Sequence, residues 1–183
     1  MKKVILSISA MLVASISFAQ ANVSAVNQFG IANAAVVTQV GLANDSDVLQ
    51  IGLANLAIVD QDGRHNEADV NQGGALNFAK VDQRNRRNDA YIGQLGIGNA
   101  AFIYQDGRRN DAVIGQAGFL NYARTTQIGR DNSATNFQLG IGNSSNTMQE
   151  GHDNNSLGLQ VGIGNSANVD QFGEYNNAFT IQF

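Results

Sequence analysis

The sequence contains no cysteine, no proline and no tryptophan, and only two histidines. Without cysteine the chain cannot form the disulfide framework on which many small exported domains depend. Charged residues make up 14% of the chain, whereas an ordinary globular domain has about 25%. The formal net charge is −4, and a mildly acidic chain is a poor candidate for binding nucleic acid. Stability must therefore come from residues that are abundant, and these include 20 glycines and many side-chain amides.

The N-terminal segment has the features of a secretory signal peptide. Lys2 and Lys3 precede an apolar run that ends in small residues, which predicts cleavage after Ala19 or Ala21. A membrane anchor is the alternative, but the apolar run is short for a span and is interrupted by serines. We therefore interpret residues 1–21 as a signal peptide and residues 22–183 as the mature chain, whose formal net charge would be −6 without the two lysines.

A glutamine recurs every 11 residues through the mature chain without one slip. An asparagine lies six residues before each glutamine, beginning at Asn22, and a glycine lies two residues after it. Asn85 replaces the glycine once, and asparagine is the next-best residue for a left-handed backbone. The glutamines are Gln28, Gln39, Gln50, Gln61, Gln72, Gln83, Gln94, Gln105, Gln116, Gln127, Gln138, Gln149, Gln160, Gln171 and Gln182. The later asparagines are Asn33, Asn44, Asn55, Asn66, Asn77, Asn88, Asn99, Asn110, Asn121, Asn132, Asn143, Asn154, Asn165 and Asn176. The glycines are Gly30, Gly41, Gly52, Gly63, Gly74, Gly96, Gly107, Gly118, Gly129, Gly140, Gly151, Gly162 and Gly173.

The residues from asparagine to glutamine alternate with the period of a β-strand. In "NAAFIYQ", residues 99–105, one face carries Asn99, Ala101, Ile103 and Gln105. In the other copies this face again has alanine or serine in second place and usually valine or isoleucine in third place, whereas the opposite face varies freely. The strict face is therefore predicted to be buried. The spacing predicts a strand of seven residues followed by a turn of four residues, with the glycine at positive φ.

Two 11-residue units are predicted to form one rung of 22 residues, because alternate turns have different chemistry. The turn after Gln94 is the apolar "LGIG", whereas the turn after Gln105 is the charged "DGRR". The sequence therefore predicts an all-β fold, a β-solenoid of stacked strand–turn–strand rungs. Its two parallel, in-register sheets would face each other in a cross-β arrangement. The charged edge would stack four arginines that are each 22 residues apart, Arg64, Arg86, Arg108 and Arg130.

The amide columns are predicted to hold the turns in register. Equivalent residues of a solenoid lie about 4.8 Å apart, so glutamine or asparagine can link amide to amide along the stack. A ligand-binding role fits less well, because a binding site needs different residues that converge.

The ends of the repeat array are predicted to be open. The repeat starts at Asn22 and its last glutamine is Gln182, which leaves no room for a polar cap at either end. An open strand is a template for another chain, and stacking of identical copies builds a filament. The last strand is uncharged and β-prone, and its predicted docking residues are Ala178, Phe179, Thr180, Ile181, Gln182 and Phe183.

The pattern N-x-[AS]-x-Φ-x-Q-x-G-x-x-N, in tandem behind a signal peptide, resembles the curlin repeats of bacterial curli subunits. The resemblance covers residues 22–183. It implies a secreted amyloid fibre at the cell surface that serves biofilm matrix, adhesion and surface colonisation. It also implies a nucleator subunit and a dedicated outer-membrane secretion channel as partners. The regular repeats and the uncharged last strand favour the major subunit, with the minor nucleator as the alternative.

Other functions are weakly supported by the sequence. Both histidines fall in charged turns and no metal-ligand spacing or phosphate-binding loop is present, so we expect no enzyme activity, no catalytic or metal site and no cofactor. The remaining alternative is a monomeric β-solenoid with a ligand- or ice-binding face. That function would need a flat outward column of one residue type, and the outward columns are mixed.

Overall fold

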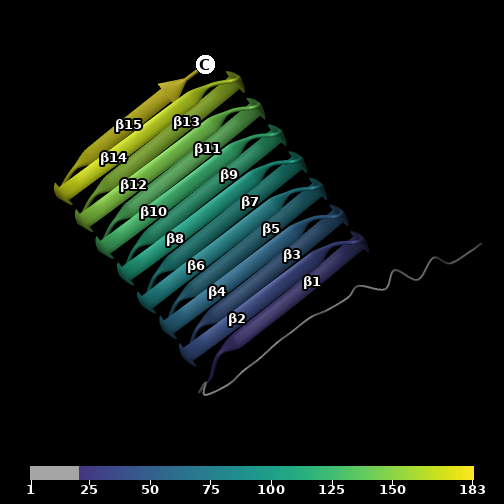
Figure 1. Ribbon diagram of the computed structural model, residues 1–183, viewed down its shortest axis with the longest axis horizontal. Helices are drawn as coiled ribbons and strands as arrows, with labels where there is room; N and C mark the ends of the chain where they lie inside the picture. The colour runs from purple at the N-terminus through teal and green to yellow at the C-terminus, as the bar shows by residue number, and fades with distance from the viewer. Residues whose placement is uncertain (1–20) are drawn as a thin grey trace, which may run out of the picture.

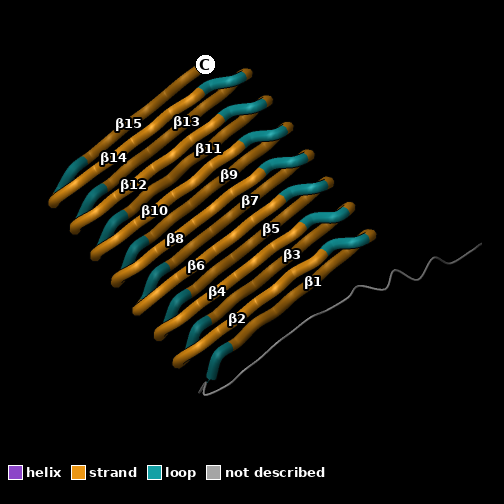
Figure 2. Tube along the Cα trace, viewed as in Figure 1, coloured by secondary structure: helices purple, strands orange, loops and turns teal. Residues whose placement is uncertain are grey.

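The computed structural model describes residues 21–183, so the predicted signal peptide lies outside the described residues except for Ala21. The chain forms consecutive β-strands that stack in two layers (Figure 1), and short loops join them (Figure 2). The strands are β1 (Val23–Ile31), β2 (Ala34–Leu42), β3 (Asp45–Leu53), β4 (Leu56–Arg64), β5 (Glu67–Ala75), β6 (Phe78–Arg86), β7 (Asp89–Ile97), β8 (Ala100–Arg108), β9 (Asp111–Phe119), β10 (Tyr122–Arg130), β11 (Ser133–Ile141), β12 (Ser144–His152), β13 (Asn155–Ile163), β14 (Ser166–Glu174) and β15 (Asn177–Gln182). Among these residues, no helix is long and apolar enough to cross a membrane.

Successive strands alternate between two parallel sheets. The odd-numbered strands β1 to β15 form an 8-stranded sheet, and the even-numbered strands β2 to β14 form a 7-stranded sheet. Each strand pairs in register with the strand two places along the chain, as Gln28 pairs with Gln50 and Gln105 with Gln127. Two strands therefore make one rung, and the predicted β-solenoid is confirmed. Because the number of strands is odd, β15 lies in the same sheet as β1 and the described solenoid contains a half rung.

The core lies between the two sheets and consists of small and β-branched side chains. In β8 the side chains of Ala101, Ile103 and Gln105 are buried, whereas those of Phe102 and Tyr104 lie on the outer face and are partly exposed. The same alternation recurs in the inner strands, where columns of alanine and of valine or isoleucine from both sheets meet. This confirms that the strict face of the repeat is the buried face.

The strands are longer than the sequence predicted. Each full repeat has a strand of 9 residues, which begins after the asparagine and continues past the glycine, so only two residues lie between strands. The glycine stays in the strand despite its positive φ, for example 126° at Gly96, because it remains paired with the glycines of the neighbouring rungs. The chain reverses at the residue before the asparagine, where Ala43 (φ 53°) and His65 (φ 56°) are left-handed. Backbone hydrogen bonds between rungs hold these positions, as His65 N–H donates to Leu42 O at 2.9 Å.

One part of the core is polar. Asn136 occupies the column that elsewhere holds valine or isoleucine, and its amide donates to Thr125 Oγ1 at 2.9 Å and to Thr147 Oγ1 at 3.2 Å across the core. Ser145 Oγ donates to Asn136 Oδ1 at 3.0 Å. A side chain at Gly158 would meet Asn136 Oδ1 at 2.7 Å, so glycine leaves the space for this amide. The polar groups of Asn136, Thr125, Thr147 and Ser145 are therefore satisfied by one another, whereas Ser156 Oγ on the neighbouring β13 has no partner among the described residues.

Candidate assembly site

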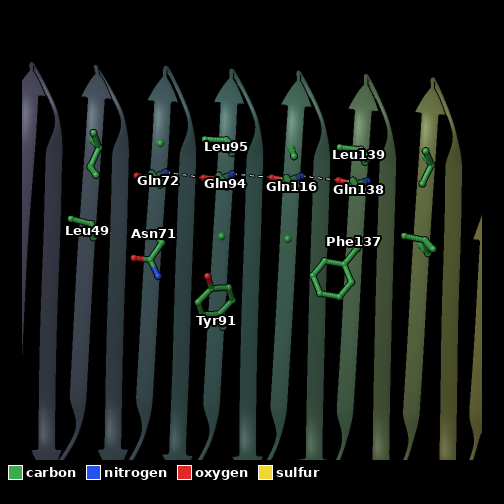
Figure 3. A pocket seen from close by; sticks show the side chains of 17 residues that line it. Leu49, Asn71, Gln72, Tyr91, Gln94, Leu95, Gln116, Phe137, Gln138 and Leu139 are labelled. Carbon is green, nitrogen blue, oxygen red and sulfur yellow. Dashed lines mark hydrogen bonds between the residues drawn. The ribbon is translucent and has the colours of Figure 1, made fainter.

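The glutamines form two continuous hydrogen-bonded columns along the solenoid, one in each sheet. From Gln28 to Gln160, the side-chain amide of each repeated glutamine donates to the side-chain carbonyl of the glutamine one rung further along the chain, at 2.6–2.9 Å. Figure 3 shows four members of one column, Gln72, Gln94, Gln116 and Gln138, in a line. All donors point the same way, so the column has a polarity along the axis.

From Gln39 onward, each glutamine of the repeat also joins the two sheets across the core. The second hydrogen of its amide bonds to a backbone carbonyl of the preceding strand, as Gln94 Nε2 donates to Phe78 O at 2.9 Å and Gln105 Nε2 to Asp89 O at 2.7 Å. The inner glutamines are buried, and Gln105 has no exposed surface. A buried amide whose donors and acceptor are all bonded holds both the stacking distance and the position of the facing strand.

The asparagines form a second pair of columns, which lie in the turns. The backbone N–H of Asn99 donates to Asn77 Oδ1 at 3.1 Å, one rung earlier. The side-chain amide of Asn99 donates to Gly118 O at 3.1 Å and to Leu95 O at 3.3 Å. The asparagine side-chain oxygens therefore accept hydrogen bonds from the following rung, whereas the glutamine side-chain amides donate hydrogen bonds to the following rung.

The repeated glycines are required by the distance between rungs. A Cβ atom at Gly96 would lie 1.9 Å from Gly118 O, and one at Gly107 would lie 1.8 Å from Gly129 O. These positions have φ near 126° and 141°, which side chains rarely allow. Asn85 takes this place with a φ of 73°, and its Nδ2 contacts Asp106 Oδ1 on the next rung.

At both ends of the described solenoid the outermost strands pair on one side only. In the 8-stranded sheet β1 pairs only with β3 and β15 only with β13, and in the 7-stranded sheet β2 and β14 are the edges. β15 carries the predicted docking residues. Phe179 and Phe183 point outward and are 66% and 88% exposed, while Ala178 and Thr180, on the inner face, are only partly buried for lack of a neighbour.

The outer face of the 8-stranded sheet is apolar where the strands approach their C-terminal ends. A shallow groove of about 640 Å³ runs across β5, β7 and β9 there. Figure 3 shows Leu95 and Leu139 on one side of the groove and Tyr91 and Phe137 on the other. Outward-facing glycines such as Gly93 make up part of its floor. Gly93 is not one of the repeated turn glycines, because it lies in the middle of β7.

The same sheet carries a column of carboxylates near the start of its strands. Asp45, Glu67, Asp89 and Asp111 are directly in register on β3, β5, β7 and β9. Burial, together with Glu67, Asp111 and Asp69, raises the pKa of Asp89 to about 6. Burial also raises the pKa of Asp111 above its ordinary value. Like charges in register disfavour the stacked state, and they do so most when every carboxylate is ionised.

The 7-stranded sheet has a charged outer face and edge. Arg64, Arg86, Arg108 and Arg130 are in register at the ends of their strands, which confirms the predicted arginine column. Exposed ion pairs lie nearby, for example Arg130 Nε with Asp131 Oδ2 at 3.3 Å. The two outer faces of the solenoid therefore differ: the 8-stranded sheet combines an apolar groove with a column of carboxylates, and the 7-stranded sheet carries an arginine column at its edge.

Within the described part of the chain, no three acidic, histidine or cysteine side chains are grouped so that they could hold a metal ion. His152 lies at the charged edge and its Nε2 is 2.7 Å from Glu174 Oε1, with both side chains largely exposed. The chemistry that recurs is hydrogen bonding along the stack, so the open ends of the amide columns and of the two sheets form the candidate assembly site.

Comparison with known families matches this repeat. The sequence model of the curlin associated repeat fits the chain three times in tandem, over residues 41–74, 74–107 and 107–140. Together these matches cover more than half of the chain, and every boundary falls on one of the repeated glycines. A comparison with curated proteins finds no match to this chain.

Proposed function

The chain belongs to the curlin-repeat family, and from this membership we propose that it is the structural subunit of an extracellular amyloid fibre. The observation that supports the proposal is that both ends of the described solenoid are open. Both sheets end in strands that pair on one side only, and the amide columns that hold the rungs together end with unused bonding capacity within residues 21–183. A second copy of the chain provides the matching strands and amides, and repeated addition builds a fibre.

The same proposal covers export and biological role. The signal peptide directs the chain out of the cytoplasm, an outer-membrane secretion channel exports it unfolded, and a nucleator starts the fibre at the cell surface. The fibre then serves as biofilm matrix and supports adhesion and surface colonisation. The regular columns and the uncharged β15 favour the major subunit over the nucleator.

The test is polymerisation of residues 22–183 with and without preformed seeds. We expect a lag phase that seeds remove, and fibre diffraction with a meridional reflection at about 4.7–4.8 Å. A chain that stays monomeric at high concentration, with or without seeds, would instead support the alternative of a solitary solenoid that binds a ligand, and the apolar groove beside Tyr91 would then be its candidate site.

A further inference from the structure

The two ends of the solenoid are complementary to each other rather than to themselves. At the β14/β15 end, Gln171 and Gln182 each use one amide hydrogen on a backbone carbonyl, at 3.0 and 2.8 Å, and have no further glutamine to donate to within residues 21–183. At the β1/β2 end, the side-chain oxygens of Gln28 and Gln39 receive no donor from the described residues, although both amides donate onward. Donors at one end and acceptors at the other require head-to-tail stacking.

The half rung decides how the next copy must be oriented. The upper end presents β14 in one sheet and β15 in the other, and β15 lies half a rung beyond β14. If the next copy kept the same orientation, its β1 would sit on β15 and its β2 above β14. The distance from β14 to that β2 would then be about 9.6 Å, twice the normal strand spacing of about 4.8 Å. One strand would be missing from that sheet, and the glutamine column would break there.

A rotation of about 180° about the fibre axis removes this gap. The rotated copy places its β1 on β14 and its β2 on β15, so both sheets continue at the normal spacing. The 11-residue repeat permits this exchange, because odd and even strands carry the same inward residues. In β1 these are Ser24, Val26 and Gln28, and in even strands they are again a small residue, usually an aliphatic residue, and glutamine.

Building on the proposed fibre, we propose that consecutive subunits made of these fifteen strands alternate by a half turn, with β14 pairing to β1 and β15 to β2 of the next copy. Gln171 then donates to Gln28 and Gln182 to Gln39, so both columns cross the junction. The exposed rings of Phe172 and Phe29 become direct cross-strand neighbours, a favourable pairing. The rise per subunit is seven and a half rungs, about 36 Å, and the filament repeats every two subunits.

Introduced cysteines test the junction without interference, because the chain has none of its own. The pair Asn27→Cys with Asp170→Cys places one thiol on β1 and one on β14, at equivalent outward positions. The matched pair Asn27→Cys with Ile181→Cys replaces the β14 position by its equivalent on β15. Fibres of each double variant are assembled under reducing conditions, freed of reductant, treated with a short crosslinker that carries two thiol-reactive groups, and dissolved for gel electrophoresis.

Alternation predicts a ladder of covalent multimers from the β1/β14 pair and almost none from the β1/β15 pair, whose thiols would lie on opposite faces of the filament. The reverse pattern overturns alternation but leaves the fibre proposal intact. Fibres that crosslink with neither pair also overturn the proposed junction. A chain that forms no fibres at all, even without substitutions, overturns both proposals, so failure of the junction and failure of the function are distinguishable. Electron cryomicroscopy of wild-type fibres provides a second measurement, which is expected to show a rotation near 180° per subunit rather than near 0°.

Discussion

Replacement of Gln94 by alanine is expected to weaken the fibre far more than replacement of Tyr91, which lies three residues away on the outer face of the same strand. The side chain of Gln94 accepts from Gln72 at 2.8 Å and donates to Gln116 and to Phe78 O, each at 2.9 Å. Alanine leaves Gln116 Oε1 without its donor and deprives Gln72 of one acceptor, in a site where Gln94 itself is 4% exposed. Each buried polar group left without a partner costs about 1–3 kcal/mol, so we expect a total loss of about 3 kcal/mol.

The assay is the concentration of soluble chain that remains when fibre growth reaches its plateau. In the proposed function the soluble chain is unfolded, so the substitution removes hydrogen bonds from the fibre alone. A loss of about 3 kcal/mol in fibre stability raises the plateau concentration on the order of 100-fold. The control is Tyr91→Ala on the outer face of the same strand, where a surface change of about 0.5 kcal/mol shifts it by less than about 3-fold. Similar shifts for both variants would refute the structural role of the amide column.

Other changes test the glycine columns and the carboxylate column. Gly96→Ala is expected to block or strongly slow assembly, because its Cβ would lie 1.9 Å from Gly118 O. Gly93→Ala should be tolerated, because there the nearest atoms belong to the movable Tyr91 ring. Equal growth of these two variants in a seeded assay would contradict the close-contact argument. For the carboxylates, the pKa of Asp89 is raised to about 6 in the folded chain, so the folded state binds more protons than the unfolded state between about pH 4 and 6. Fibre stability should therefore rise as pH falls through 6, seen as a lower plateau concentration. Exchange of Asp89 and Asp111 for asparagine should flatten this dependence and shorten the lag at pH 7, whereas an unchanged pH profile in that variant would count against the column.

The features that could be predicted from the sequence are those that repeat. Gln94 belongs to a column in which glutamine returns every 11 positions, and Ala101 to one that holds alanine or serine. The alternation between these columns has the period of a strand, so strand type, burial and rung length follow directly. The ends of the strands could not be placed, because the left-handed corner is occupied by residues as different as Ala43 and His65. Backbone hydrogen bonds between rungs hold that corner, and these bonds do not depend on the residue type.

Features that depend on neighbouring rungs in a single place were also missed. The alternation places Gly93 on the outward face, but nothing in the period shows that the ring of Tyr91 lies over it. The sequence shows that the aliphatic column is interrupted at Asn136, but its bonds to Thr125 and Thr147 depend on the half-rung offset between the sheets. Such positions are determined by the packing of two sheets rather than by the repeat of one strand.

In the proposed fibre, the half rung would also affect how neighbouring filaments meet. The outer face of the 8-stranded sheet exposes Leu95, Leu139 and Ile163, whereas the 7-stranded sheet exposes the arginine column on its edge. If all subunits had the same orientation, each filament would carry one uninterrupted apolar stripe, and the area available for side-to-side sticking would grow with filament length. With subunits that alternate by a half turn, each side of the filament presents the 8-stranded sheet of one subunit and then the 7-stranded sheet of the next. The change occurs at every junction, once in seven and a half rungs. The stripe is then interrupted at every junction, so a chain with an odd number of strands can keep strong growth along the axis while limiting adhesion between filaments.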